Sequence, residues 1–343
     1  MRILITGSAG FIGCNMAQAW RKQGHTITVY DNLSRPGSER NLEWLRATAG
    51  DAIQFTHGDI RDAAAITAAV RDVDVVVHLA GQVAVTTSIT RPREDFEINA
   101  LGTFNVLEAA RNAPTPPIVM YASTNKVYGG MEDLAIVEEP TRYRYRDMPN
   151  GIPESQPLDF HSPYGCSKGA GDQYVRDYHR IYGLRTVVFR QSCCYGMRQF
   201  GVEDQGWVAH FIIASQLNRP IFIYGDGKQA RDVLYVDDLV AAYTLALENI
   251  DVAAGKVYNI GGGQANSLSI WAEFQPILSR LAGRTITPAN TVDWRPGDQP
   301  VFISDNSKIE RELGWRPNVG VADGIERLWN WVRDNRALFE ERG

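Results

Sequence analysis

The sequence is poor in cysteine and has no grouping of cysteine or histidine typical of a metal site. Its four cysteines show no Cys-x-x-Cys spacing, and its six histidines form no His-Glu-x-x-His or similar array. Disulfide-stapled domains and zinc sites need such spacings. We therefore expect reduced thiols and no bound metal.

Long apolar runs and clusters of basic residues are also missing. No run approaches the roughly 20 apolar residues of a membrane-spanning helix. The net charge is −5, and lysine and arginine are scattered, so no basic surface for nucleic acid or anionic membranes is expected. The first strand is predicted to begin at Arg2, which leaves no room for a signal peptide. These features predict a soluble, cytoplasmic protein with no nucleic-acid or membrane partner.

What the chain does contain is an alternation of short β-rich runs with helical segments. It has 343 residues, of which 44% are hydrophobic, enough for one large α/β domain with a smaller appendage or for two domains. The strand candidates are Arg2–Thr6, Thr26–Tyr30, Ile53–His57, Asp74–His78, Ile118–Tyr121, Arg185–Phe189 and Val257–Ile260. Their continuous valine and isoleucine content predicts a parallel sheet buried on both faces. Intervening helices at Phe11–Gln23 and Phe96–Arg111 make the expected fold a doubly wound parallel α/β (Rossmann) sheet.

The amino-acid composition changes after Arg190, where glycine, proline, tryptophan and tyrosine become frequent. We interpret this part as a smaller, mixed α/β substrate-binding domain, interleaved with the last strand of the sheet. The expected division is 1–189 plus about 234–262 for the Rossmann domain, and 190–233 plus 263–343 for the substrate domain. The segment Pro149–Pro163, rich in proline and polar residues, is predicted to be a loop that leads to a helix.

A glycine-rich turn joins the first predicted strand to the first helix. In Thr6-Gly7-Ser8-Ala9-Gly10-Phe11-Ile12-Gly13, the first glycine allows a tight turn, the second admits a pyrophosphate and the third allows close packing of helix on strand. The N-terminus of the helix offers positive potential to phosphates. Such a turn alone is weak evidence, but here the strand, the helix and a downstream acid accompany it.

That acid is Asp31, at the end of the second strand and about 20 residues beyond the last glycine. Its carboxylate is expected to accept hydrogen bonds from the adenosine ribose hydroxyls and to repel a 2′-phosphate. Arg35 lies nearby and would suit NADP, but the carboxylate at the strand end favours NAD. A solvated aspartate in a turn is the alternative.

Tyr164 and Lys168 are four residues apart and share one face of a predicted helix. Elsewhere such a pair is usually a surface contact; beside a dinucleotide site it suggests chemistry. A phenol with a pKa of about 10 is a poor base at neutral pH. A nearby ammonium and the positive nicotinamide ring both favour the phenolate, so we expect the pKa of Tyr164 to fall. Lys168 would also hold the nicotinamide ribose.

Two hydroxyl residues, Ser123 and Thr124, follow the fifth predicted strand. Ligands bind at the carboxyl ends of parallel strands, where a hydroxyl can hydrogen-bond a substrate hydroxyl that is losing its proton. Spacing does not choose between the two, and either could belong to an ordinary polar turn.

Several motifs together resemble the extended short-chain dehydrogenase/reductase family of NAD-dependent epimerases and dehydratases. The resemblance runs nearly end to end. It is carried by Gly7-x-x-Gly10-x-x-Gly13, Asn99 within Asn99–Thr103, Thr124 with Tyr164 and Lys168, Val127–Gly129, Arg231–Asp238 and Leu313–Pro317. Within the family, the segments Ser123–Gly129, Phe189–Gly196 and Gly201–Trp207 are most similar to the CDP-paratose 2-epimerase (CDP-tyvelose epimerase) subgroup.

This resemblance implies a nucleotide-sugar substrate, a tightly held NAD that is regenerated in each turnover, and inversion at C2 of the hexose from CDP-paratose to CDP-tyvelose. It assigns catalysis to Thr124, Tyr164 and Lys168. The cofactor residues that it implies are Gly7, Gly10, Phe11, Ile12, Gly13, Asp31, Asn32, Ser34, Arg35, Asp59, Ile60, Leu79, Ala80, Gln82, Asn99, Tyr164 and Lys168. The substrate residues that it implies are Ser123, Thr124, Asn125, Cys193, Trp207, Arg231 and Arg295, the two arginines gripping the diphosphate.

The sequence departs from related enzymes at a few positions. Nucleotide-sugar 4,6-dehydratases carry Asp-Glu after the threonine as acid and base, where this chain has Asn125 and Lys126, so dehydration is disfavoured. Cys193 stands where many relatives have asparagine, and Met197 where they have proline. The sugar pose therefore cannot be transferred from 4-epimerases. Lys126 would either contact the phosphate or sugar or be a plain surface lysine.

The leading hypothesis is epimerisation through a 2-keto intermediate, because the C2 hydrogen of a hexose is not acidic enough for direct removal. One alternative is an epimerase acting at C2 or C4 of CDP-glucose, GDP-mannose or a UDP-hexose. Another is a non-catalytic sensor of NAD(H), which the joint presence of Thr124, Tyr164 and Lys168 disfavours.

The state of assembly is open at this stage. The helices at Phe96–Arg111 and Gly165–Tyr182 carry apolar and aromatic faces, which include Phe104, Leu107, Tyr174, Tyr178 and Ile181. Such faces are usually core stripes. The family resemblance instead implies that the two helices pair across the interface of a homodimer, itself free to form a homotetramer.

Overall fold

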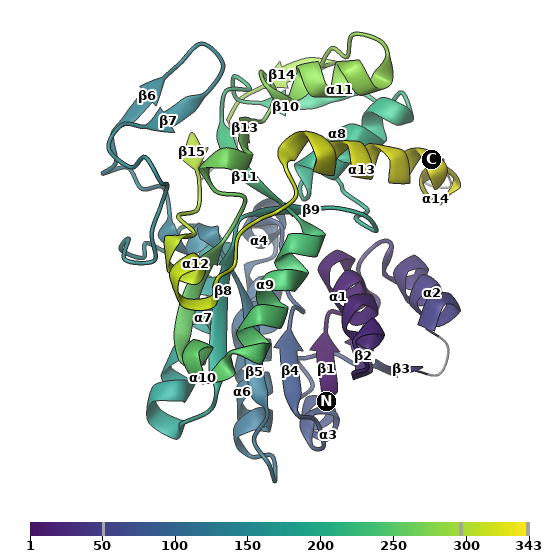
Figure 1. Ribbon diagram of the computed structural model, residues 1–343, viewed down its shortest axis with the longest axis vertical. Helices are drawn as coiled ribbons and strands as arrows, with labels where there is room; N and C mark the ends of the chain where they lie inside the picture. The colour runs from purple at the N-terminus through teal and green to yellow at the C-terminus, as the bar shows by residue number, and fades with distance from the viewer. Residues whose placement is uncertain (50–51, 295–297, 341–343) are drawn as a thin grey trace.

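A seven-stranded sheet forms the centre of the protein in the computed structural model, which describes residues 1–49, 52–294 and 298–340 (Figure 1). All neighbouring strands are parallel, in the order β12-β8-β5-β4-β1-β2-β3. The strands are β1 (Arg2–Thr6), β2 (Thr26–Asp31), β3 (Ile53–His57), β4 (Val75–His78), β5 (Ile118–Thr124), β8 (Thr186–Gln191) and β12 (Lys256–Ile260). They confirm the seven predicted strands and the doubly wound fold, with small differences at the strand ends.

Helices cover both faces of this sheet, because successive side chains of each strand point to opposite sides. On β1, Ile3 and Ile5 pack in one apolar cluster, whereas Leu4 packs in another. The first cluster is closed by α1 (Phe11–Lys22), α2 (Ser38–Ala49), α9 (Val236–Glu248) and α12 (Ser307–Leu313). The second is closed by α3 (Ala63–Val70), α6 (Gly102–Arg111) and α7 (Ser162–Tyr182).

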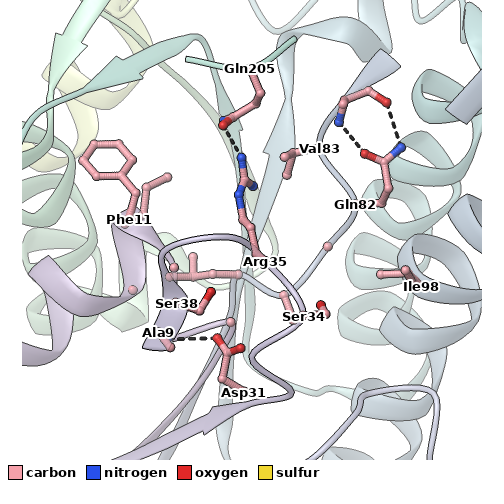
Figure 2. A pocket seen from close by; sticks show the side chains of 18 of the residues that line it. Ala9, Phe11, Asp31, Ser34, Arg35, Ser38, Gln82, Val83, Ile98 and Gln205 are labelled. Carbon is pink, nitrogen blue, oxygen red and sulfur yellow. Dashed lines mark hydrogen bonds between the residues drawn. The ribbon is translucent and has the colours of Figure 1, made fainter. Parts of the chain in front are cut away.

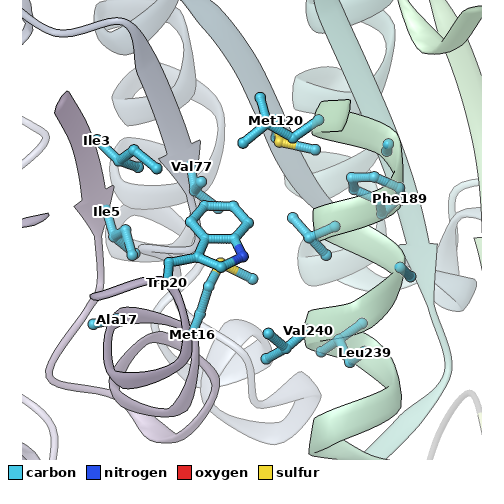
Figure 3. Close-up of a cluster of buried hydrophobic side chains, with 14 of the residues drawn as sticks. Ile3, Ile5, Met16, Ala17, Trp20, Val77, Met120, Phe189, Leu239 and Val240 are labelled. Atoms are coloured by element: carbon cyan, nitrogen blue, oxygen red, sulfur yellow. The ribbon is translucent and has the colours of Figure 1, made fainter. Parts of the chain in front are cut away.

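Trp20 is one of two buried tryptophans in the first cluster. It lies between the sheet and α9, near Val77 and Leu239 (Figure 3). Its indole N–H donates to the Thr244 hydroxyl at 2.7 Å, so its single polar group keeps a partner inside the core. Helix α1, which begins at the glycine turn, is thereby fixed on the sheet.

A smaller mixed α/β part lies beyond the carboxyl ends of the central strands (Figure 1). Its main sheet has the order β13-β11-β15, with β9 paired to β11, and a two-stranded sheet joins β10 to β14. Its elements are β9 (Cys193–Tyr195), α8 (Trp207–Gln216), β10 (Phe222–Tyr224), β11 (Ala230–Tyr235), β13 (Ser267–Ser269), α11 (Phe274–Ala282), β14 (Asn290–Val292), β15 (Val301–Phe302) and α13 (Val321–Asp334). An apolar core of its own holds these elements together.

The remaining elements are short. They are α4 (Val85–Thr90), β6 (Ile136–Glu138), β7 (Tyr143–Tyr145), α10 (Ile250–Ala253), α14 (Ala337–Glu340) and the 3₁₀ turns η3 (Asn125–Tyr128) and η4 (Gln264–Asn266). No helix in the described part of the chain is long and apolar enough to cross a membrane.

The predicted helical stretch Phe96–Arg111 is helical throughout but is not a uniform α-helix. The segment comprises the end of α5 (Pro92–Phe96), one π-helical stretch η2 (Glu97–Leu101) and then α6. The wider turn lets the side chain of Asn99 reach the loop after β4, where it makes hydrogen bonds. The loop predicted at Pro149–Pro163 ends two residues earlier in the structure, because α7 begins at Ser162. A helix tolerates proline in its first turn, so Pro163 belongs to α7.

Candidate active site

A cavity of about 590 Å³ opens at the carboxyl ends of β1, β2, β4 and β5. The strand order reverses between β1 and β4, and open α/β sheets bind ligands at such a switch point. Every residue predicted for the cofactor except Asn99 lines this cavity. The structure therefore brings these side chains together, although they come from four strand–helix connections and from α7.

Two glycines of the turn after β1 are sterically required. Gly7 has a φ of +71°, and a Cβ there would lie 2.7 Å from the backbone nitrogen of Ala80. A Cβ on Gly13 would lie 2.4 Å from Cα of Ser8. The turn therefore packs against the loop after β4 and against its own helix, leaving the N-terminus of α1 at the cavity.

Asp31, at the end of β2, links this turn to the strand by hydrogen bonds. One carboxylate oxygen accepts the backbone N–H of Ala9 at 2.9 Å (Figure 2). The other accepts that of Leu33 at 2.8 Å. Burial raises the pKa of Asp31, and these two hydrogen bonds act against the rise. Since each carboxylate oxygen can accept two hydrogen bonds, capacity remains for ribose hydroxyls. The cradle fits the adenosine end of a dinucleotide.

Arg35 crosses the cavity and donates to the side-chain oxygen of Gln205 (Figure 2). Gln205 and its neighbours Phe200, Val202 and Asp204 line the cavity but were not predicted as cofactor residues. They lie in an irregular loop after β9, where no periodic pattern or strand end marks a ligand-facing position.

Asn99 is buried and acts from behind the cavity wall. Its amide oxygen accepts the backbone N–H of Gln82 at 2.9 Å, and its amide N–H donates to the carbonyl of Gln82 at 3.0 Å. Asn99 therefore does not line the cavity itself but holds Gln82, which does, and its contact with the cofactor stays a prediction.

Tyr164 and Lys168 stand one turn apart in α7 and both line the cavity. Burial raises the pKa of Tyr164 to about 12, while a hydrogen bond with Thr124 and the charge of Arg35 lower it. In the protein without a cofactor, the pKa of Tyr164 therefore does not fall as expected but rises. The reason is that desolvation of the phenolate outweighs the nearby favourable groups.

Lys168 is held firmly inside the site. Its ammonium donates to the carbonyl of Ala122 at 2.6 Å and lies 4.3 Å from the ring centroid of Tyr121. Burial lowers its pKa to about 7, and the carboxylates of Asp172 and Asp95 act in the opposite direction. Its charge thus depends on the acids around it.

The structure distinguishes the two hydroxyls after β5. Ser123 lines the cavity, but its hydroxyl already donates to the buried carboxylate of Asp172 at 2.8 Å. Thr124 hydrogen-bonds Tyr164 and also accepts the backbone N–H of Lys126 at 3.2 Å. The geometry therefore favours Thr124 as the hydroxyl beside the reactive phenol.

Two of the predicted substrate residues, Cys193 and Arg231, lie on the paired strands β9 and β11. Arg231 is buried and pairs with Asp298 at 2.7 Å, and it also donates to the carbonyl of Gln299 at 2.6 Å. The charge of Arg231 affects the pKa of both Cys193 and Lys126. Lys126 is partly buried and its pKa falls to about 8, chiefly through burial, so the interpretation as a plain surface lysine is wrong.

The other predicted substrate residues are less informative. Asn125 and Trp207 are partly exposed at the same end of the molecule, and Arg295 lies outside the described residues. Across the described ranges no group of three or more histidine, cysteine, aspartate or glutamate side chains could hold a metal ion, and the four cysteines are free thiols.

A parallel sheet with this glycine turn, a strand-end carboxylate and a buried Tyr/Lys pair at the switch point defines a dinucleotide-dependent redox enzyme. Residues 3–261 match the sequence model of the NAD dependent epimerase/dehydratase family. The chain belongs to this family, and it is an NAD-dependent enzyme of the epimerase type. The sensor interpretation is not supported.

Similar proteins cover nearly the whole chain. A CDP-paratose 2-epimerase from Salmonella typhi is 46% identical over 339 residues, 97% of this chain and 99% of that protein. The UDP-glucose 4-epimerase of Thermus thermophilus, solved with NAD, has a TM-score of 0.80, 31% identity and coverage of 97% and 99%. The dTDP-glucose 4,6-dehydratase of Streptomyces venezuelae, also solved with NAD, has a TM-score of 0.83, 32% identity and 99% coverage of both chains.

Proposed function

We propose that this enzyme inverts C2 of a CDP-activated hexose, converting CDP-paratose to CDP-tyvelose through a 2-keto intermediate. The observation that carries the proposal is the 46% identity with a CDP-paratose 2-epimerase along almost the full length of both chains. A UDP-glucose 4-epimerase from Mycolicibacterium smegmatis reaches 32% over a similar length. We infer the CDP-sugar substrate from this difference in sequence identity and from the residues around the site.

In the proposed mechanism the glycine turn, Asp31 and Lys168 hold NAD, which when bound takes up a hydride from the sugar and returns it. Tyr164, as the phenolate, accepts the proton of the C2 hydroxyl, and Thr124 orients that hydroxyl. After the keto sugar has turned to present its other face, the phenol of Tyr164 gives the proton back. No net oxidation results.

The residues after Thr124 support epimerisation over dehydration. Elimination of water needs an acid and a base beside the sugar. Asn125 cannot ionise, and Lys126 lies close enough to Arg231 for that cation to lower its pKa. The pair thus offers a neutral amide and a cationic group to the substrate, a combination suited to binding phosphate oxygens or sugar hydroxyls.

The nucleotide has to stay bound while the sugar turns, and we assign this task to Arg231 and Arg295. The side chain of Arg231 is already oriented by Asp298, which reduces the entropy lost when it binds a diphosphate. Within the same proposal, residues 1–189 plus about 234–262 bind the cofactor, and 190–233 plus 263–343 bind the nucleotide sugar. The cytoplasmic location and the tightness of NAD binding stay predictions.

The test is a substrate panel without added NAD: CDP-paratose, CDP-glucose, GDP-mannose, UDP-glucose and UDP-galactose, with the sugars identified by NMR. We expect a C2 epimer from CDP-paratose, formed by cofactor that copurifies with the enzyme. A C4 epimer from a UDP-sugar would preserve the fold and the Tyr/Lys chemistry but reject the proposed substrate. No product after addition of NAD would reject the whole substrate proposal.

We also propose that α6 and α7 pair with those of a second copy in a homodimer, which could associate further into a tetramer. Leu107 and Tyr178 are buried in the core, but Phe104, Tyr174 and Ile181 of the same predicted faces are exposed. The rings of Phe104 and Tyr174 touch at a centroid distance of 5.8 Å and form one apolar surface across both helices.

Light scattering after size exclusion should give at least twice the chain mass of 38.2 kDa. The Ile181→Asp variant should shift the protein towards the monomer, because it places a charge on the exposed apolar face of α7. A monomeric wild type would contradict the proposal.

A further inference from the structure

A buried carboxylate that the mechanism does not use lies behind the catalytic helix. Asp95, near the end of α5, is almost completely buried. One of its oxygens accepts the side-chain N–H of Gln82 at 2.9 Å and that of Asn99 at 3.1 Å. The other accepts the hydroxyl of Ser167. Asp95 is thus hydrogen-bonded by three side chains from three separate segments.

Each partner of Asp95 lines the active-site cavity or contacts a residue that does. Ser167 lies between Tyr164 and Lys168 in α7, and its hydroxyl oxygen is 3.2 Å from the amide nitrogen of Asn99. Gln82 lines the cofactor cavity. Asp95 and Asn99 are four residues apart on one helical face, and both contact Gln82 and Ser167. A single carboxylate therefore connects the cofactor loop to the helix that carries the Tyr/Lys pair.

We propose that Asp95 is a positioning residue: it fixes the Tyr164/Lys168 pair against the cofactor loop and sets the pH range in which the pair works. This inference rests on the catalytic roles proposed above for Tyr164 and Lys168. It adds a charged residue that touches neither substrate nor cofactor but acts on both catalytic groups.

The effect of Asp95 on the working pH range follows from the charges that face each catalytic group. Asp95 raises the pKa of Tyr164, whereas Thr124 and Arg35 lower it. Lys168 faces two acids, Asp172 and Asp95, and both raise its pKa against the effect of burial.

Two further rings face Lys168 but carry no charge near neutral pH. Burial raises the pKa of Tyr121 well above its usual value and lowers that of His78 to about 3. Loss of the Asp95 charge should therefore lower the pKa of both catalytic groups, since a buried carboxylate disfavours a nearby phenolate and favours a nearby ammonium.

The direct test is an NMR titration of holoenzyme labelled with ¹³C-lysine, which is practical because the chain contains six lysines. The Lys168 signal is assigned by its loss in Lys168→Arg. In Asp95→Asn, which keeps the shape and one acceptor oxygen, the titration midpoint of Lys168 should fall by about one pH unit. A midpoint equal to that of the wild type would overturn the proposal.

Two variants separate charge from structure. Glu97→Gln removes a nearby acid of η2 that is partly exposed and faces Arg93 at 3.4 Å, and it should leave the Lys168 midpoint unchanged. Ser167→Ala keeps the Asp95 charge but removes its contact with α7. It should lower turnover while the Lys168 midpoint stays near that of the wild type. If Asp95→Asn fails to fold, a wild-type turnover in Ser167→Ala would by itself reject the positioning role.

The pH profile of turnover gives the second readout. Turnover needs Tyr164 as the phenolate and Lys168 as the ammonium, so the pKa values of both groups shape the pH profile. Since both pKa values drop in Asp95→Asn, both limbs of the profile should move to lower pH. Limbs that coincide with those of the wild type would contradict the proposal. Failure of wild-type enzyme on CDP-paratose would reject the proposed substrate alone, because the lysine titration needs no turnover and still decides the role of Asp95.

Discussion

Replacing Tyr164 by phenylalanine is expected to lower turnover about a thousandfold while NAD remains bound. The phenol is buried beside Thr124 and is the group placed to take and return the substrate proton. Phenylalanine keeps the ring that packs in α7 and removes only the hydroxyl. The measurements are the rate of epimer formation and the amount of NAD released on denaturation of the purified variant.

Tyr182→Phe is the matched control, because this tyrosine ends the same helix and is about half exposed. It should retain wild-type turnover within a factor of two or so, as expected for a surface substitution. If Tyr164→Phe kept a substantial part of the activity, another group would have to be the base. Loss of bound NAD in that variant would instead show that the hydroxyl serves the cofactor site.

The largest effect on stability is expected at a buried ion pair between α7 and β8. Asp172 accepts two hydrogen bonds from the guanidinium of Arg190, at 2.9 and 3.0 Å, and both side chains are excluded from water. Removal of one partner leaves an uncompensated buried charge, which typically costs about 3–5 kcal/mol. We therefore expect Asp172→Ala to lower the free energy of unfolding by that amount. In this variant Arg190 retains only its hydrogen bond to the uncharged Tyr128 hydroxyl, at 3.0 Å.

Urea unfolding at fixed NAD concentration measures this effect. Asp323→Ala is the comparison, since Asp323 pairs with Arg327 at 2.8 Å on an exposed face of α13. An exposed pair contributes about 0–1 kcal/mol because water screens it. Equal losses in the two variants would show that the Asp172–Arg190 pair is not worth more than a surface contact, and would contradict the argument from burial.

The fold and the cofactor turn could be predicted from sequence because their signals are local. Runs of β-branched residues mark the strands, and the spacing of Gly7, Gly10 and Gly13 with the later Asp31 describes one strand–helix–strand unit. Tyr164 and Lys168 share a helix face, so their proximity also follows from their spacing. In each case the informative residues lie within one element or in adjacent ones.

Other features depend on contacts that sequence spacing does not reveal. Ser167 is 72 residues from Asp95, and Gln205 is 170 residues from Arg35. No periodicity marks Glu97–Leu101 as a wide helical turn or shows that Asn99 within it holds the loop at Gln82.

The sequence alone determined the parallel sheet, the glycine turn, the preference for NAD and the Tyr/Lys pair, because local propensity and spacing encode them. Tertiary structure decided which hydroxyl faces Tyr164, which acids surround Lys168 and in which direction burial moves the pKa of Tyr164. These properties depend on desolvation and on charges brought together from distant segments. They arise only when the chain has folded.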